Sequence, residues 1–313
     1  MQDNEILLAF KAMLRIREVE ERIAREFFEQ KIFSFLHLMT GQEASPVGVI
    51  SALDNFDQVI GNHRSHGHYL AKGGNLARLV WEVFGDVRGC CRGFGGSMHM
   101  VDREVGFMGS TPILGSAAPI SAGFAFKKKL CRDPGVVVCF IGDGAAEEGV
   151  FLETINLAAS KELPILFVIE DNKYSVNTPH AIRKGKYHDF GQLFGGLGAN
   201  YQRVDGQRVE VVFNAAKSLR DKTLGGVPSI LHLDVNRRHG HSGPMKENTM
   251  AEYRMEEDTI DRRDASDCIA LVKPLVLRAL SSDTNRLESM IEEITHGVRK
   301  ELDLIMETID VRK

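Results

Sequence analysis

The stretch VCFIGDGAAEEG, residues 138–149, places Asp143 between two glycines, after an apolar run and before a helical-looking segment. Gly142 and Gly144 let the backbone turn sharply, and the N–H groups that follow can point at an anion where a helix begins. A carboxylate here repels a phosphate unless a hard divalent cation lies between them. Asp143 is therefore a candidate magnesium ligand beside a diphosphate, and the simpler alternative is a helix cap.

Such a magnesium site needs a second oxygen donor from a neighbouring strand end. The next apolar run, LPILFVIEDNKYS at residues 163–175, is followed by Asn172 where the run gives way to polar residues. Ligands of a parallel sheet bind where strands end and helices begin, so Asp143 and Asn172 are expected to lie close together. The pair is a stronger signal than G-D-G alone, for which the capping role is an equal alternative.

Short apolar runs that alternate with helical patterns must position these residues. VVVCFI from residue 136, ILFVI from 165 and SILHLDV from 229 are continuous apolar runs of strand length. Runs of this kind separated by helices indicate a parallel sheet that is buried on both faces. We expect an α/β fold with a doubly wound, mostly parallel sheet and helices on both faces.

Helical patterns flank this region at both ends of the chain. An amphipathic helix is predicted over residues 4–30, with a cap at Asp3 or Asn4. Its apolar positions recur at helical spacing: Leu7, Phe10, Leu14, Ile23 and Phe27. A charged region after residue 245 carries one long helical stripe, expected to pack as core or at a subunit contact: Leu287, Ile291, Ile294, Val298, Leu302 and Ile305. The expected units are an amino-terminal helix (1–30), an α/β domain (31–245) and a helical carboxy-terminal extension (246–313), packed on the same domain or on a partner.

Composition restricts the function classes. The 313 residues are 43% hydrophobic and 26% charged, as in ordinary globular proteins, and the net charge of −4 suggests no nucleic-acid or membrane surface. No apolar run approaches the roughly 18 residues that span a bilayer. The start MQDNEILLAF fits neither a signal peptide nor a transit peptide, and the five cysteines read as reduced thiols, so a cytoplasmic protein is expected.

Several blocks, taken in order, resemble one enzyme family. G-D-G followed about thirty residues later by Asn is similar to the thiamine-diphosphate motif. The further blocks are HLMTGQEA at 37–44, HRSHGHYLAKG at 63–73, GFGGSMHM at 93–100 and RRHGHS at 237–242. Together they resemble the α subunit of the thiamine-dependent decarboxylating component of 2-oxoacid dehydrogenase complexes, of pyruvate, branched-chain or acetoin type. The resemblance covers roughly residues 5–265.

This resemblance implies a set of site residues. It makes Asp143 and Asn172 magnesium ligands through their side chains, and Tyr174 a ligand through its backbone carbonyl. The turn at Gly142 and the N–H groups of Gly144 and Ala145 would bind the diphosphate of thiamine diphosphate.

The remaining implied contacts come from other blocks. Arg64 would pair with a diphosphate oxygen, beside His63, which stands where many relatives have Tyr. Pro112 and Leu114 match backbone positions that contact the aminopyrimidine ring. His241 matches a histidine near the diphosphate and the reacting carbon, and His37 matches one that lines the substrate entry.

The resemblance also implies an oxidoreductase that works in an assembly. The substrate would be a 2-oxoacid or acetoin, and the acyl group would pass to a lipoyl-bearing acyltransferase component. A separate β subunit would supply the activating glutamate, in a heterotetramer of two α and two β chains, because too little chain follows residue 240 for a second α/β domain.

Other readings remain open at this point. A transketolase-like ketol transferase and a cofactor-free interaction subunit are the alternatives; a dinucleotide-binding enzyme is disfavoured because the turn lacks the third glycine of that fingerprint. His63, His66 and His68 could bind zinc, although Arg64 among them would repel a cation. If they do not bind zinc, His66 and His68 are expected to be hydrogen-bonded residues of the core or of a loop. The basic run 127–129 is expected to be a solvated helix end. Glu147 replaces an Asn that many relatives have.

Overall fold

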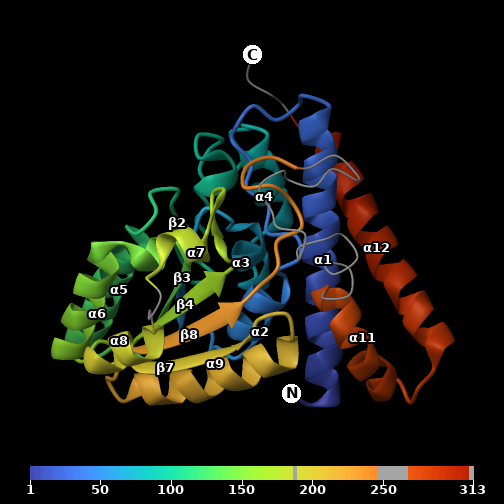
Figure 1. The fold of residues 1–313 in the computed structure, drawn as a ribbon. Helices are drawn as coiled ribbons and strands as arrows, with labels where there is room; N and C mark the ends of the chain where they lie inside the picture. Colours follow the sequence, from blue (N-terminus) through green and yellow to red (C-terminus); the bar gives the residue numbers. More distant parts are fainter. Residues whose placement is uncertain (186–188, 245–266, 310–313) are drawn as a thin grey trace.

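The computed structural model describes residues 1–185, 189–244 and 267–309 (Figure 1). The larger helices are α1 (Asp3–Phe28), α2 (Ala44–Ser51), α3 (His66–Ala71), α4 (Leu76–Val83), α5 (Ala117–Cys131), α6 (Gly149–Ser160), α7 (His180–Arg183), α8 (Phe190–Gly196), α9 (Val209–Leu224), α11 (Cys268–Ala279) and α12 (Thr284–Met306). Two 3₁₀ turns, η1 (Gly96–Met98) and η2 (Ala145–Glu147), complete the described helical elements. The strands are β1 (Gln58–Gly61), β2 (Phe107–Ser110), β3 (Val137–Gly142), β4 (Ile165–Asp171), β5 (Tyr174–Ser175), β6 (Thr178–Pro179), β7 (Asn200–Asp205) and β8 (Ser229–Asp234).

Six strands form one sheet in the order β2-β1-β3-β4-β8-β7, and each neighbouring pair is parallel. The three apolar runs identified in the sequence are β3, β4 and β8. The chain moves outward in one direction from β1 to β2 and in the other from β3 to β4. The strand order therefore reverses between β1 and β3, which is where open α/β sheets bind ligands. This arrangement confirms the predicted α/β fold.

Both faces of the sheet are buried, which explains the continuous apolar runs. On one face Val138 and Phe140 belong to a core shared with α2, α4 and α9. On the other face Val137, Cys139 and Ile141 pack with α5, α6 and α8. Successive strand residues point to opposite faces, so a strand covered on both sides needs an apolar residue at nearly every position.

A third core joins the two ends of the chain. The long helix α1 packs against α11 and α12, which stand beside it in Figure 1. The predicted apolar stripe lies on α12: Leu287 belongs to this third core, whereas Val298 and Leu302 belong to the core shared with α2 and α4. The stripe is therefore packed within this chain. The expected domain boundary at 245/246 lies outside the described residues.

Three local expectations can be compared with the structure. Helix α1 starts at Asp3 and is capped at Gln2, whose N–H donates to Glu5 at 2.5 Å, so the expected cap at Asp3 or Asn4 was wrong by one or two residues. Lys128 was expected to be solvated, but it is 4% exposed because its Nζ donates to the carbonyls of Phe56 and Pro134. All five cysteines are free, as expected. In the described parts of the chain, no helix has the length and apolarity needed to cross a membrane.

Candidate active site at the carboxyl edge of the sheet

The predicted site residues follow the carboxyl ends of adjacent strands. His63 and Arg64 come after β1, Asp143 after β3, Asn172 after β4, and the segment with His241 after β8. These four strands are neighbours in the order β1-β3-β4-β8, and all of them are parallel. One edge of the sheet therefore receives chemistry-bearing residues from segments far apart in the sequence, on both sides of the point where the strand order reverses.

Asp143 is buried and fully engaged by positive groups of this chain. Its side chain is 2% exposed, and its Oδ2 accepts hydrogen bonds from the Nε2 of His180, at 2.9 Å, and from the guanidinium of Arg183. Arg183 also donates to Glu147 at 2.6 Å. The short hairpin β5-β6 turns the chain back after β4, so that α7 carries both His180 and Arg183 onto this carboxylate.

His180 links Asp143 to a second buried carboxylate. Its Nε2 lies 3.0 Å from Asp171 Oδ1, and the other oxygen of Asp171 lies 2.8 Å from His232 Nε2. Burial opposes charge on both groups, but the hydrogen bonds between Asp171 and its two histidines outweigh it. They lower the pKa of Asp171 and, together with Asp143, raise the pKa of His180.

The turn after β3 differs from the expected direct entry into a helix. Gly144 is followed by the 3₁₀ turn η2, and α6 begins only at Gly149. A Cβ on Gly144 would lie 2.5 Å from Ser175 Oγ, so only glycine fits this close approach. The N–H groups of Gly144 and Ala145 thus belong to the turn and to η2, five residues or fewer before the helix.

The donor set at this edge suits a hard divalent cation. Asp143 offers a carboxylate, Asn172 a side-chain oxygen that accepts from the N–H of Tyr174 at 3.2 Å, and Tyr174 a backbone carbonyl. These are oxygen ligands of the kind magnesium prefers. Asp143 and Asp171, bridged by His180, bring two buried negative charges to the ends of β3 and β4.

His37, His63 and His241 form a cluster that sequence spacing could not reveal. Their ring centroids lie 4.9, 5.2 and 5.7 Å apart, and among the described residues no hydrogen-bond partner is found for either ring nitrogen of His63 or for Nδ1 of His37. Burial, followed by the positive charge of Arg64, lowers the pKa of His37 to about 3 and that of His241 to about 4. The same causes lower the pKa of His63. All three imidazoles are therefore neutral at neutral pH.

Arg64 joins the backbone of His241 to that of Leu38, the residue after His37. The side chain of Arg64 is buried, and it donates to the carbonyls of Leu38 and His241, each at 2.7 Å. It also lies 3.3 Å from His241 Nδ1. The guanidinium predicted to meet a diphosphate thus also binds the main chain on either side of the cluster.

The alternative zinc site does not form among the described residues. His66 is fully buried and bonds Glu20 and Ser97, whereas His68 bonds Glu170. Both are hydrogen-bonded core histidines, which was the alternative to zinc binding in the sequence analysis. They lie in the first turns of α3, just after the loop that carries His63 and Arg64, so their buried hydrogen bonds hold the end of that loop in place.

The two residues predicted to contact the aminopyrimidine ring lie on the loop after β2. Pro112 is partly exposed, and Leu114 is 44% exposed.

A separate pocket of about 450 Å³ lies beside the histidine cluster. It is lined by Leu36 and Ser242, the neighbours of His37 and His241, and by the apolar side chains of Phe27, Ile32 and Phe33.

His180, Arg183 and Asp171 were missed by the sequence reasoning. Asp171 directly precedes a predicted ligand, and a second acid at a strand end is a signal that could have been used. The pairing of Arg183 with Asp143, 40 residues away, depends on the β5-β6 hairpin and has no signature in spacing.

Comparison with known proteins agrees with this architecture. The family model described as "Dehydrogenase E1 component" matches residues 11–308. The α subunit of acetoin:2,6-dichlorophenolindophenol oxidoreductase is 36% identical in Cupriavidus necator, over 93% of this chain and 87% of that protein. The same subunit from Bacillus subtilis is 32% identical, over 96% and 88%.

A mitochondrial relative extends the comparison to another substrate class. The pyruvate dehydrogenase E1 component subunit alpha-1 of rice is 33% identical, over 96% of this chain and 74% of that protein. Thiamine diphosphate is the cofactor that this family implies, and α subunits of this kind work with a β subunit. The sheet edge, the family match and the relatives agree, and the chain belongs to the dehydrogenase E1 component family as an α subunit of the pyruvate or acetoin dehydrogenase type.

Proposed function

We propose that this α subunit acts on a 2-oxoacid or on acetoin and passes the resulting acyl group to a lipoyl-bearing acyltransferase component. The observation that carries the proposal is the convergence of Asp143, Asn172 and the histidine cluster on the carboxyl ends of neighbouring parallel strands. The relatives named for acetoin and for pyruvate support both substrate classes.

Magnesium is the metal that the donor set fits. Asp143 and Asn172 would hold it through their side chains and Tyr174 through its backbone carbonyl, because a hard cation favours these oxygens. Asp143 is 2% exposed and is held by His180 and Arg183, so a cation bound there would replace at least one of these positive partners. Gly142 ends β3 at this edge, and the N–H groups of Gly144 and Ala145 would bind the diphosphate.

The histidine cluster would handle protons and orient the substrate. Bound thiamine diphosphate supplies a nucleophilic carbon that adds to a carbonyl and a ring that accepts the electrons released by bond cleavage. His37 and His241 have lowered pKa values and are neutral at neutral pH, so each would accept a hydrogen bond from a substrate through an unprotonated ring nitrogen. Arg64 would pair with a diphosphate oxygen, and His63 would complete the wall of the site beside it.

The activating carboxylate would come from the β subunit, in a heterotetramer of two α and two β chains. Within the described residues, each buried glutamate already accepts hydrogen bonds from this chain: Glu20, Glu26, Glu43, Glu82 and Glu170. None of them is left to act on the aminopyrimidine ring, which Pro112 and Leu114 would contact. Ile113 and Leu114, 69% and 44% exposed, leave apolar surface beside that position for another chain.

The proposal is tested by titrating the αβ complex with thiamine diphosphate and Mg²⁺. Asp143→Ala should lose magnesium-dependent cofactor binding, whereas Asp283→Ala, which removes an exposed helix cap on α12, should retain it. Unchanged binding in Asp143→Ala would contradict the metal assignment. Turnover of pyruvate, branched-chain 2-oxoacids, acetoin and sugar phosphates, measured with 2,6-dichlorophenolindophenol, then identifies the substrate. Activity confined to sugar phosphates would favour the transketolase-like alternative.

A further inference from the structure

The two segments that carry His37 and His241 run side by side in opposite directions. The N–H of Gly243 donates to the carbonyl of Leu36 at 2.7 Å, and the N–H of Arg238 donates to that of Thr40 at 2.9 Å. Between these two bonds, the guanidinium of Arg64 joins the carbonyls of Leu38 and His241. The relative register of these segments thus determines where the two imidazoles meet.

A tight turn holds one end of this pairing. Gly41 has a φ of +95°, and a Cβ there would lie 2.6 Å from the carbonyl oxygen of Asn236 and 2.8 Å from Cγ of Arg238. Both carboxylate oxygens of Glu43 accept from the N–H of Gly41, at 3.1 and 3.0 Å. The turn formed by residues 40–43 is therefore pressed against the segment that leads to His241.

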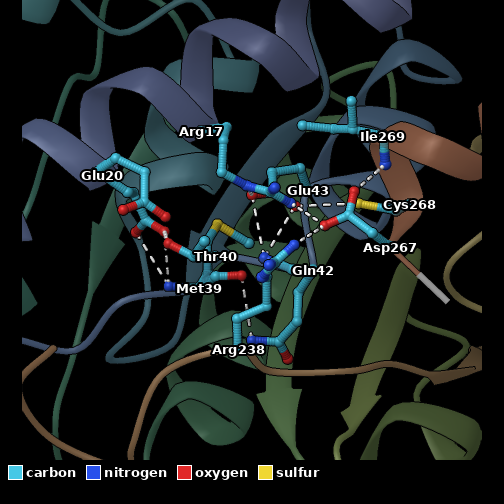
Figure 2. Close-up of polar contacts among 12 residues, drawn as sticks. Arg17, Glu20, Met39, Thr40, Gln42, Glu43, Arg238, Asp267, Cys268 and Ile269 are labelled. Carbon is cyan, nitrogen blue, oxygen red and sulfur yellow. Dashed lines mark hydrogen bonds and ion pairs between the residues drawn. The ribbon is translucent and has the colours of Figure 1, made fainter. Parts of the chain in front are cut away.

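A chain of alternating charges fixes this turn to the helices behind it (Figure 2). Glu43, fully buried, accepts from Arg17 of α1 at 2.5 and 2.9 Å. Arg17 lies 3.0 Å from Asp267, and Asp267 accepts from Arg238 at 2.6 Å. Two carboxylates and two guanidiniums alternate, so each charge in this largely buried chain has an opposite neighbour.

Asp267 has two separable tasks in this chain of charges. Its Oδ1 caps α11 by accepting from the N–H groups of Ile269 and Ala270, whereas its Oδ2 meets both Arg17 and Arg238. Asparagine caps helices as well as aspartate does. The substitution Asp267→Asn therefore removes the charge and keeps the cap.

We propose that Asp267 is a positioning residue for His241: through Arg238 it sets the register of the His241 segment against the His37 segment. The inference rests on the proposed function, in which His241 serves the reaction. It assigns a role in turnover to a side chain at the start of α11, whose partners among the described residues are Arg17, Arg238 and the first N–H groups of that helix.

The test compares Asp267→Asn with Asp283→Asn in the αβ complex. Asp283 caps α12 in the same way, through the N–H of Arg286, and has no link to the histidine segments. We expect Asp267→Asn to lower kcat at least tenfold, with KM and cofactor affinity within about threefold. The assay is run well below the unfolding temperatures of both variants, because the loss of a largely buried charge lowers that of Asp267→Asn further than that of Asp283→Asn. Asp267→Glu, which keeps the charge, should recover part of kcat.

A double-mutant cycle and a spectrum complete the test. Arg238→Gln should lower kcat as Asp267→Asn does, and the double variant should lose little more than either single one. In ¹⁵N-histidine spectra of the α chain, with His241 assigned through His241→Gln, Asp267→Asn should shift the His241 imidazole signals and Asp283→Asn should not.

Unshifted signals, or equal losses in both Asn variants, would overturn the positioning role. If the wild-type complex turns over none of the substrates, the proposed function fails, while the spectra still decide the inference.

Discussion

Arg183 occupies the carboxylate that the cation needs, so its removal should strengthen cation binding. Asp143 is 2% exposed and Arg183 11% exposed, and the guanidinium contacts Asp143 directly. Two opposite charges about 4 Å apart attract by about 4 kcal/mol at an effective dielectric constant of about 20. Arg183 keeps its bond to Glu147 when it leaves Asp143. We take roughly a third of that attraction, ~1.4 kcal/mol, as the free energy needed to displace Arg183 from Asp143 when the cation binds. This free energy corresponds to about a tenfold change in the Kd of the cation.

The assay is a titration with Mn²⁺, an EPR-visible substitute for Mg²⁺, in the absence of thiamine diphosphate. Arg183→Gln should bind Mn²⁺ about tenfold more tightly than the wild type. Arg299→Gln is the matched control, because it removes a guanidinium that pairs with Glu18 of α1 rather than with Asp143. Asp143→Ala shows how much of the measured Mn²⁺ binding belongs to this site, because it removes the carboxylate ligand. Equal or weaker Mn²⁺ binding in Arg183→Gln would refute the competition.

Three further outcomes are expected. His241→Gln should lower kcat far more than cofactor affinity, measured by single-turnover kinetics and by calorimetry; a change in affinity alone would make His241 a binding residue. Burial lowers the pKa of His63 well below 6.5. As the pH falls through 6.5, the unfolded chain therefore takes up a proton that the folded chain does not, and the free energy of unfolding decreases. As the pH is lowered, the unfolding temperature of His63→Phe should fall less than that of the wild type. An equal dependence of the unfolding temperature on pH in the two proteins would argue against a neutral His63 in the folded chain. The α chain alone should show no turnover until its β subunit is added, and full activity of the purified α chain would contradict the assembly.

The sequence was most informative where one physical requirement dominates. A strand buried on both faces must be apolar throughout, so β3, β4 and β8 were recognised, together with the fold that they build. The edge strands β2 and β7 and the short β1 carry no such signature; β7, for example, reads NYQRVD and is partly exposed along its length. Asp143 and Asn172 were found because the motif couples their spacing to strand ends.

The parts of the site that were not foreseen depend on long-range geometry. The hairpin β5-β6 brings Arg183 to Asp143, and the three histidines come from three segments that are distant in the sequence. The burial that lowers their pKa values is a property of the packed site, so their neutral state could not be read from residue types.

The division of the interior into three cores gives each of two cores a built-in reporter thiol. Cys139 is buried in the core on the α5–α6 face of the sheet, and Cys268 is buried in the core that joins α1 to α11. Cys131 is exposed, so an alkylating reagent modifies it without any opening of the fold. The alkylation rates of Cys139 and Cys268 then measure how often each core opens, and a difference between them would reveal that the sheet and the terminal helices separate before the molecule unfolds as a whole.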